Sequence, residues 1–207
     1  MRKFIIITVF FSWMCVSVVN YDTAKINYKS KNVRTSGYFE GGVMEVEEIS
    51  MCASNSRKTR YTFGKIGLNH QMGYGISKNL EIGGQFGGEI GKQKEENNAS
   101  SSFTYLYSLG YLKIGGKKAD ENLALKLGFG GGIFYSAPDF GFFPLGYADL
   151  MFGFSNPEKL TLYGGINFPL LYRFGLNLNF SRFSLLGQVN FSEGYFFSIK
   201  LGTGYKF

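Results

Sequence analysis

Residues 195–207 read YFFSIKLGTGYKF, and their side chains alternate in character with a period of two. One face of the segment would carry Phe197, Ile199 and Leu201, whereas the other would carry Ser198 and Lys200. A period of two with one apolar face is the pattern of a β-strand. Aromatic residues at both ends of that face, with aliphatic residues between them, are typical of a strand that crosses a bilayer.

The composition favours many strands of this kind. The 207 residues include 22 Phe, 14 Tyr and 29 Gly but only 4 Pro, so strand formers and glycine dominate the chain. The net charge is +7, but the basic residues are scattered through candidate turns, as at Lys117, Lys159 and Arg182. Because no basic stripe alternates with exposed aromatic residues, nucleic-acid binding is not expected. A basic surface facing anionic lipid is the simpler interpretation.

Residues 1–17 have the pattern of an export signal. Arg2 and Lys3 precede an apolar run that is shorter than the roughly 20 residues a spanning helix needs. Cleavage after Ser17 would remove the segment, whereas cleavage before Cys15 would make that cysteine a lipid attachment site. Met14 stands before Cys15 where a lipoprotein signal normally has a small residue. Residues 18–35 are polar and without a lasting period, which predicts a flexible tether.

Alternation like that of the terminal segment recurs along the rest of the chain. In 103–114 the apolar face would carry Phe103, Tyr105, Tyr107, Leu109 and Tyr111. The complete set of predicted strands is 36–46, 65–76, 80–90, 103–114, 123–135, 145–154, 160–168, 172–180, 183–191 and 195–207.

Counting back from the last strand assigns every connection to one side. Loops 47–60, 91–102, 136–144, 169–171 and 192–194 would lie on one side, and turns 77–79, 115–122, 155–158 and 181–182 on the other. The two longest connections, 47–60 and 91–102, then lie on one side, and the turns on the other side are short and polar, as in membrane barrels. The prediction is an all-β, antiparallel transmembrane barrel of about ten strands over residues 36–207.

Two stretches resemble the small bacterial outer-membrane β-barrel proteins. One is the C-terminal alternation that ends on Phe207 with Tyr205 two residues before it, and the other is GYGISKNLEIGG at 73–84. The resemblance implies an outer-membrane location, short periplasmic turns and longer outer loops. It also implies that Tyr205 and Phe207 form the signal read by the barrel-insertion machinery, and that the barrel contacts outer-membrane lipid and lipopolysaccharide.

A soluble barrel of the lipocalin type is the alternative fold. Such a barrel turns its apolar face inward and carries a charged exterior. Here the second face holds mainly Gly, Ser, Asn and Gln, which would fill a lumen better than it would cover a solvated surface.

The charged and amide side chains of the polar faces are the candidate site. Since an eight-stranded barrel is just filled by its side chains, ten strands leave little free width. We therefore expect a structural network of paired charges rather than a permeation path. Glu81 and Glu89 would lie about 26 Å apart along one strand, too far to act on one bond. The predicted lumen network is Lys65, Glu81, Gln85, Glu89, Lys126, Asp149, Arg173 and Lys200.

Catalysis and metal binding are not predicted. His70 is the only histidine and falls on the lipid-facing side, and Met72 stands where an outer-membrane lipid hydrolase would have serine. Without a second histidine or a partner cysteine, a metal site has no support. In the loop 136–144, Phe140, Phe142 and Phe143 would extend an aromatic girdle or form a rim that touches lipopolysaccharide or a partner.

The functional prediction is a structural or surface-interaction role. We expect a monomer without a cofactor and without enzymatic activity. A narrow pore for small solutes is the alternative, and a lipid-modifying enzyme is a more distant one.

Overall fold

The computed structural model describes Ile26 and residues 34–52, 55–95, 100–115, 122–137, 139–154, 159–167, 171–192 and 196–206. The predicted export signal at 1–17, with the candidate lipidation site Cys15, lies outside the described residues. So does Phe207, and so does most of the predicted tether 18–35. Within 18–33 only Ile26 is described, and its side chain is buried against Gly115. The predicted boundaries of the signal and the tether stay predictions.

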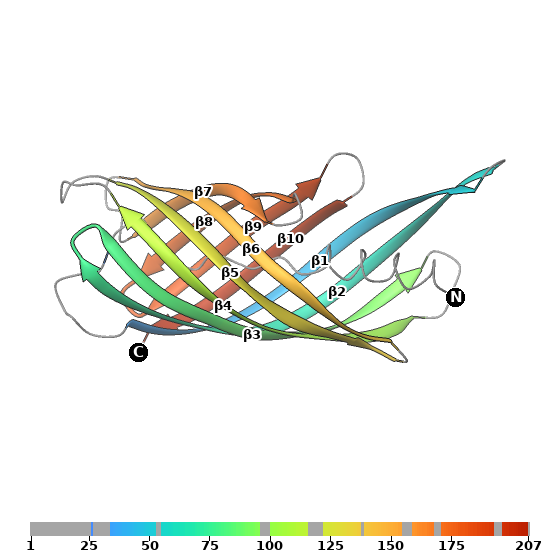
Figure 1. Ribbon diagram of the computed structural model, residues 1–207, viewed down its shortest axis with the longest axis horizontal. Helices are drawn as coiled ribbons and strands as arrows, with labels where there is room; N and C mark the ends of the chain where they lie inside the picture. Colours follow the sequence, from blue (N-terminus) through green and yellow to red (C-terminus); the bar gives the residue numbers. More distant parts are fainter. Residues whose placement is uncertain are drawn as a thin grey trace.

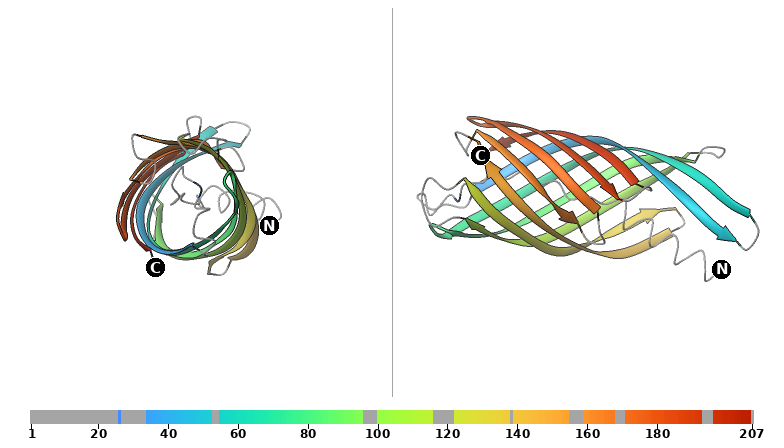
Figure 2. Two further views of the ribbon diagram at one scale, coloured as in Figure 1. Left: turned by 90° about the vertical axis from the view of Figure 1, so that its left-hand side faces the viewer. Right: turned by 90° about the horizontal axis from the view of Figure 1, so that it is seen from above.

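The described residues form a closed antiparallel barrel, in which each strand pairs with its neighbours in sequence and β1 pairs with β10 (Figures 1 and 2). The predicted fold class is confirmed. The strands are β1 (Arg34–Cys52), β2 (Asn55–Ser77), β3 (Leu80–Glu95), β4 (Ser101–Gly115), β5 (Leu123–Ser136), β6 (Asp139–Gly153), β7 (Leu160–Asn167), β8 (Leu171–Phe180), β9 (Phe183–Ser192) and β10 (Phe196–Lys206). No helix among the described residues is long and apolar enough to cross a membrane.

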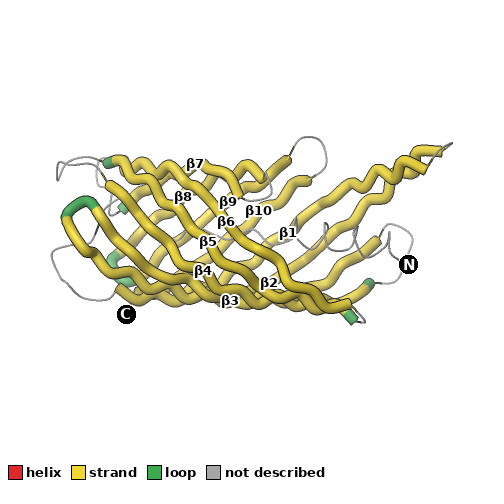
Figure 3. The backbone as a smooth tube through the Cα atoms, viewed as in Figure 1, coloured by secondary structure: helices red, strands yellow, loops and turns green. Residues whose placement is uncertain are grey.

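The two ends of the barrel differ. At one end, called here the C-terminal end, β10 stops and β2 turns into β3 (Figure 1). At the other, called the hairpin end, the β1–β2 hairpin projects well beyond the shorter strands β7 to β10 (Figure 3). Past Val46, β1 has no partner among the described residues of β10, and it continues paired with β2 as far as Cys52 opposite Asn55.

Three predicted loops at the hairpin end are therefore largely strand. Residues 47–60 form the β1–β2 hairpin, with only 53–54 between the strands. Most of 136–144 belongs to β6, β3 extends to Glu95, and β4 begins at Ser101. The prediction for 47–60 was wrong because a ribbon that leaves the barrel has no apolar side to bury, so its sequence needs no alternation. Residues 139–144 instead continue the pairing of β6 with β5, and 91–95 continue that of β3 with β2. The predicted excess of long outer loops is replaced by a difference in strand length.

The outer face of the barrel is apolar along its middle. Leu68, Phe129 and Leu201 lie on three different strands, and each side chain is more than 60% exposed. Such a surface is far larger than a soluble monomer exposes. The outward register predicted for 123–135, 145–154, 172–180, 183–191 and the terminal strand is confirmed.

The face assigned to β4 was wrong. Tyr105, Tyr107 and Leu109 are buried inside the barrel, and Leu106 between them is 50% exposed on the outside. Directly opposite partners in neighbouring strands point to the same face. Since Glu89 on β3 pairs with Tyr105, the aromatic face of β4 must share the interior with the charges of β3.

Candidate functional site in the barrel interior

All eight residues of the predicted lumen network lie on the inner face and are buried. They do not form a single cluster. Seven of them, all except Gln85, fall into three interacting groups. The interior also holds a buried lysine that was not predicted, Lys113.

The first group joins the last strand to the third. The Glu89 carboxylate on β3 accepts a hydrogen bond from the Lys200 ammonium of β10 at 2.7 Å, and its other oxygen lies 2.7 Å from the Lys65 Nζ of β2. To contact Glu89, Lys200 must reach past both β1 and β2, which lie between β10 and β3 in the barrel. Its direct partner on β1 is Gly42, where a Cβ would lie 2.6 Å from the Ile199 carbonyl oxygen and 3.2 Å from Lys200 Cγ. A glycine at this position leaves the room through which the ion pair passes.

The second group is a chain of side chains over β5, β2, β4 and β3. Lys126 Nζ donates to Gln71 Oε1 at 3.4 Å, Gln71 Nε2 donates to Tyr111 Oη at 3.4 Å, and the Tyr111 hydroxyl donates to Glu81 at 3.0 Å. Lys113 lies 3.6 Å from the same carboxylate. Lys126 also sits 4.1 Å above the Tyr111 ring centroid, within the range of a cation–π contact.

The third group pairs Asp149 on β6 with Arg173 on β8 through two hydrogen bonds to the guanidinium. Both side chains are fully buried. The guanidinium lies 4.3 Å from the Tyr147 ring centroid, and Lys126 is the direct partner of Asp149 on β5. Gly165 of β7 stands between the two paired strands, and a Cβ there would collide with the Asp149 side chain. The Asp149–Arg173 ion pair thus passes over a glycine of β7, as the Lys200–Glu89 ion pair passes over Gly42 of β1.

Neutral polar groups cover the inner wall at β7 to β10. The Tyr163 hydroxyl donates to Gln188 at 2.6 Å, Gln188 Nε2 donates to Asn190 at 2.7 Å, and Asn190 Nδ2 donates to Ser198 at 3.2 Å. Gln85, the remaining residue of the predicted network, is buried on β3 opposite Gln71.

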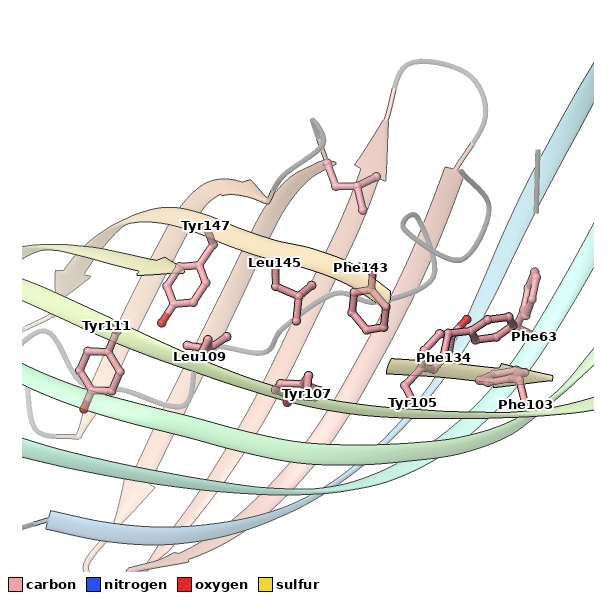
Figure 4. Packing of buried hydrophobic residues seen from close by; sticks show 11 residues of the cluster. Phe63, Phe103, Tyr105, Tyr107, Leu109, Tyr111, Phe134, Phe143, Leu145 and Tyr147 are labelled. Carbon is pink, nitrogen blue, oxygen red and sulfur yellow. The ribbon is translucent and has the colours of Figure 1, made fainter. Parts of the chain in front are cut away.

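An aromatic cluster runs along part of the barrel interior (Figure 4). Tyr105 of β4 packs against Phe134 of β5, with ring centroids 5.0 Å apart, and edge-on against Phe143 of β6 at 6.1 Å. Rings lie flat over inward glycines, as where Phe103 covers Gly91. The cluster is Phe63, Phe103, Tyr105, Tyr107, Leu109, Tyr111, Phe134, Phe143, Leu145, Tyr147 and Leu171.

The three phenylalanines predicted for a rim or girdle loop belong to strand β6 and divide between its faces. Phe140 and Phe142 are exposed on the outer face, with ring centroids 5.2 Å apart, whereas Phe143 is buried in the interior cluster. The prediction that the three phenylalanines lie together in one loop was therefore wrong. The outward pair still lies on the surface where a girdle was predicted.

His70 lies on the outer face between exposed Leu68 and Met72, and its ring centroid is 5.0 Å from that of Phe86. It is well separated from the interior groups by the barrel wall. Among the described residues no group of three His, Cys, Asp or Glu side chains could hold a metal ion.

The missed Lys113 had a signal in the sequence. Glu81 on β3 and Lys113 on β4 are direct partners across the two strands. Lys113 is also the direct partner of Lys126 on β5. A check of charge complementarity between β3 and β4 would have reversed the assignment of the β4 face.

The comparisons with known proteins concern the fold. No protein-family model matches the chain, and no curated protein matches its sequence. An outer membrane channel from Pseudomonas putida F1 is 14% identical over 92% of this chain and all of that one, with a TM-score of 0.49. The outer membrane protein AlkL is 13% identical over 92% of this chain and 97% of that one, with a TM-score of 0.41. The attachment invasion locus protein of Yersinia pestis is 16% identical over 84% of this chain and 99% of that one, with a TM-score of 0.35. The likeness extends to the β-barrel fold alone.

Proposed function

We propose that the chain is an integral barrel of the bacterial outer membrane that does not conduct solutes and that acts through the surface it presents outside the cell. The observation that carries this proposal is the burial of the interior ion pairs. Lys126, Asp149 and Arg173 have no exposed surface, and Glu89 and Lys200 are 1% exposed. A water-filled path would leave charged groups in contact with solvent, because hydration is the alternative to pairing.

The apolar outer face supports insertion into a membrane. Its large side chains face outward on successive strands around the barrel, where only lipid or another apolar surface would accommodate them. The described strands close into a barrel by backbone pairing, which is what a sheet in hydrocarbon requires.

The β1–β2 hairpin is the part best suited to contacts outside the cell. It projects beyond the barrel wall, and its paired backbone positions include Glu47 opposite Arg60 and Cys52 opposite Asn55 (Figure 1). The hairpin end faces outward in this proposal because short turns and the C-terminal strand end belong on the periplasmic side of outer-membrane barrels. We propose that the protein is a monomer without a cofactor. The interior charges already pair within one chain, so neither a second subunit nor a cofactor is needed to neutralise them.

Conductance tests the closed interior. The refolded protein in a planar lipid bilayer should give no discrete current steps, because the ion pairs and the aromatic cluster occupy the lumen. Steps that change in size when Lys126 or Arg173 is replaced by a neutral residue would show that ions pass these groups and would establish the narrow pore instead.

The proposed absence of lipid chemistry has its own test. Overproduction of the protein should leave the lipid A and phospholipid species of the cell unchanged in mass spectra, and His70→Ala should behave as the wild type does. The reason is that His70 stands among apolar side chains with no serine beside it. A new deacylated lipid that disappears in His70→Ala would contradict this proposal.

A further inference from the structure

The charged side chains whose exposure the structure describes and that reach the surface are five basic residues, which lie at the two ends of the barrel. Lys78, Lys159 and Arg182 belong to the turns of the C-terminal end or flank them, whereas Lys92 and Lys94 lie on β3 near the hairpin end. The last two differ from the others in position. They follow Ile90 on the same outward register of one strand, so they continue the lipid-facing surface instead of capping a turn.

The surroundings of the two lysines are those of a membrane interface. Ile90 is 56% exposed and pairs directly with Ile66 of β2, which is 50% exposed. The lysines come next along β3, two and four residues farther toward the hairpin end. Apolar side chains and then two ammonium groups therefore succeed one another along the outer face.

The space beside the lysines is open. Lys92 is the direct partner of Gly64 on β2 and of Ser102 on β4, and a Cβ at Gly64 would meet no atom within 4 Å. Residues two apart on a strand are separated by about 7 Å, so the two ammonium groups can approach two phosphates or one phosphate from both sides. The flanking small residues leave room for a sugar headgroup that a bulky side chain would exclude.

We propose that Lys92 and Lys94, above Ile66 and Ile90, form a binding site for the phosphorylated disaccharide and acyl chains of lipopolysaccharide. The inference rests on the proposed outer-membrane location, with the hairpin end outside, because that lipid occupies the outer leaflet. A headgroup with two phosphates and several acyl chains matches two cations over a pair of apolar strands. A glycerophospholipid, with one phosphate and two chains, would use only part of this surface.

Binding of purified diphosphoryl, hexa-acylated lipid A to the refolded full chain in detergent micelles tests the site. Native mass spectrometry or calorimetry would follow the wild type, Lys92→Ala/Lys94→Ala, and the control Lys78→Ala/Lys159→Ala, which removes the same charge from the other end. We expect the first variant to bind roughly tenfold more weakly, since each lysine near an anionic lipid surface contributes substantially. The control should change by less than about twofold, and the difference between the variants should shrink as salt rises.

Three outcomes would overturn the proposal: equal affinity of the wild type and Lys92→Ala/Lys94→Ala, equal weakening in the control, or phosphatidylglycerol bound as tightly as lipid A. The last would mean that the lysines accept any anionic lipid. A negative result in the lipid-binding experiment would not contradict the closed interior, because the closed interior is tested separately by conductance in planar bilayers. Conversely, a conducting barrel that still needs Lys92 and Lys94 for lipid A would disprove only the closed interior.

Discussion

Asp149→Ala should destabilise the folded barrel by about 3–5 kcal/mol, the cost of leaving a buried charge without its partner. The substitution removes both hydrogen bonds to the Arg173 guanidinium. It also removes the carboxylate opposite Lys126, so two cations would share a region with no exposed surface. Urea unfolding in lipid vesicles, followed by the heat-dependent shift of the folded band on a gel, measures the loss.

The double variant Asp149→Leu/Arg173→Met separates charge from packing. It fills similar volume with apolar groups, and we expect it to recover most of the stability lost in Asp149→Ala. Ser198→Ala serves as a control for the loss of a buried neutral hydrogen bond, with an expected cost of about 1 kcal/mol. If Asp149→Ala costs no more than Ser198→Ala, water reaches the pair and the interior is not closed there.

Gly42→Val should prevent normal closure of the barrel, although valine is a better strand former than glycine. Its side chain would press on the Ile199 backbone and on the stem of Lys200, at the pairing of β1 with β10. Overpacking costs about 1–3 kcal/mol, and displacement of Lys200 from Glu89 adds the cost of a broken buried ion pair. We expect a total loss above about 3 kcal/mol and a reduced yield of the compact, heat-shifted form.

Gly64→Val is the matched control on the neighbouring strand β2. A Cβ at Gly64 meets no atom within 4 Å, so the replacement should be neutral or stabilising by up to about 1 kcal/mol. Similar losses in both variants would show that glycine is needed for backbone reasons and not for the passage of Lys200.

The sequence predicted the architecture because lipid imposes a strong rule on the outer face. Strands such as 183–191 and 195–207 alternate in character apart from Leu186 and Phe196, and each was assigned to the correct face. The number of strands followed from parity, since a closed antiparallel barrel must return the last strand beside the first. The buried positions of all eight network residues were predictable for the same reason.

The errors occur where lipid does not decide the pattern. In β4 the interior is aromatic, so apolarity no longer distinguishes inside from outside, and only the pairing of Lys113 with Glu81 reveals the correct face. The β1–β2 hairpin lies beyond the barrel wall, where both of its faces can be polar. Pair formation across strands, as between Glu89 and Lys200, depends on contacts over 111 residues of sequence, which no local pattern contains.

The projecting hairpin has a further consequence for the backbone. Closure of the barrel pairs each strand on both sides, but among the described residues β1 has no partner in β10 past Val46, and β2 has none in β3 before Tyr61. In the described residues 47–52 and 55–60, the ribbon therefore presents two strand edges whose backbone donors and acceptors can pair with water or with another strand. A molecule that offers an extended peptide could bind there by adding a strand, whatever its side chains.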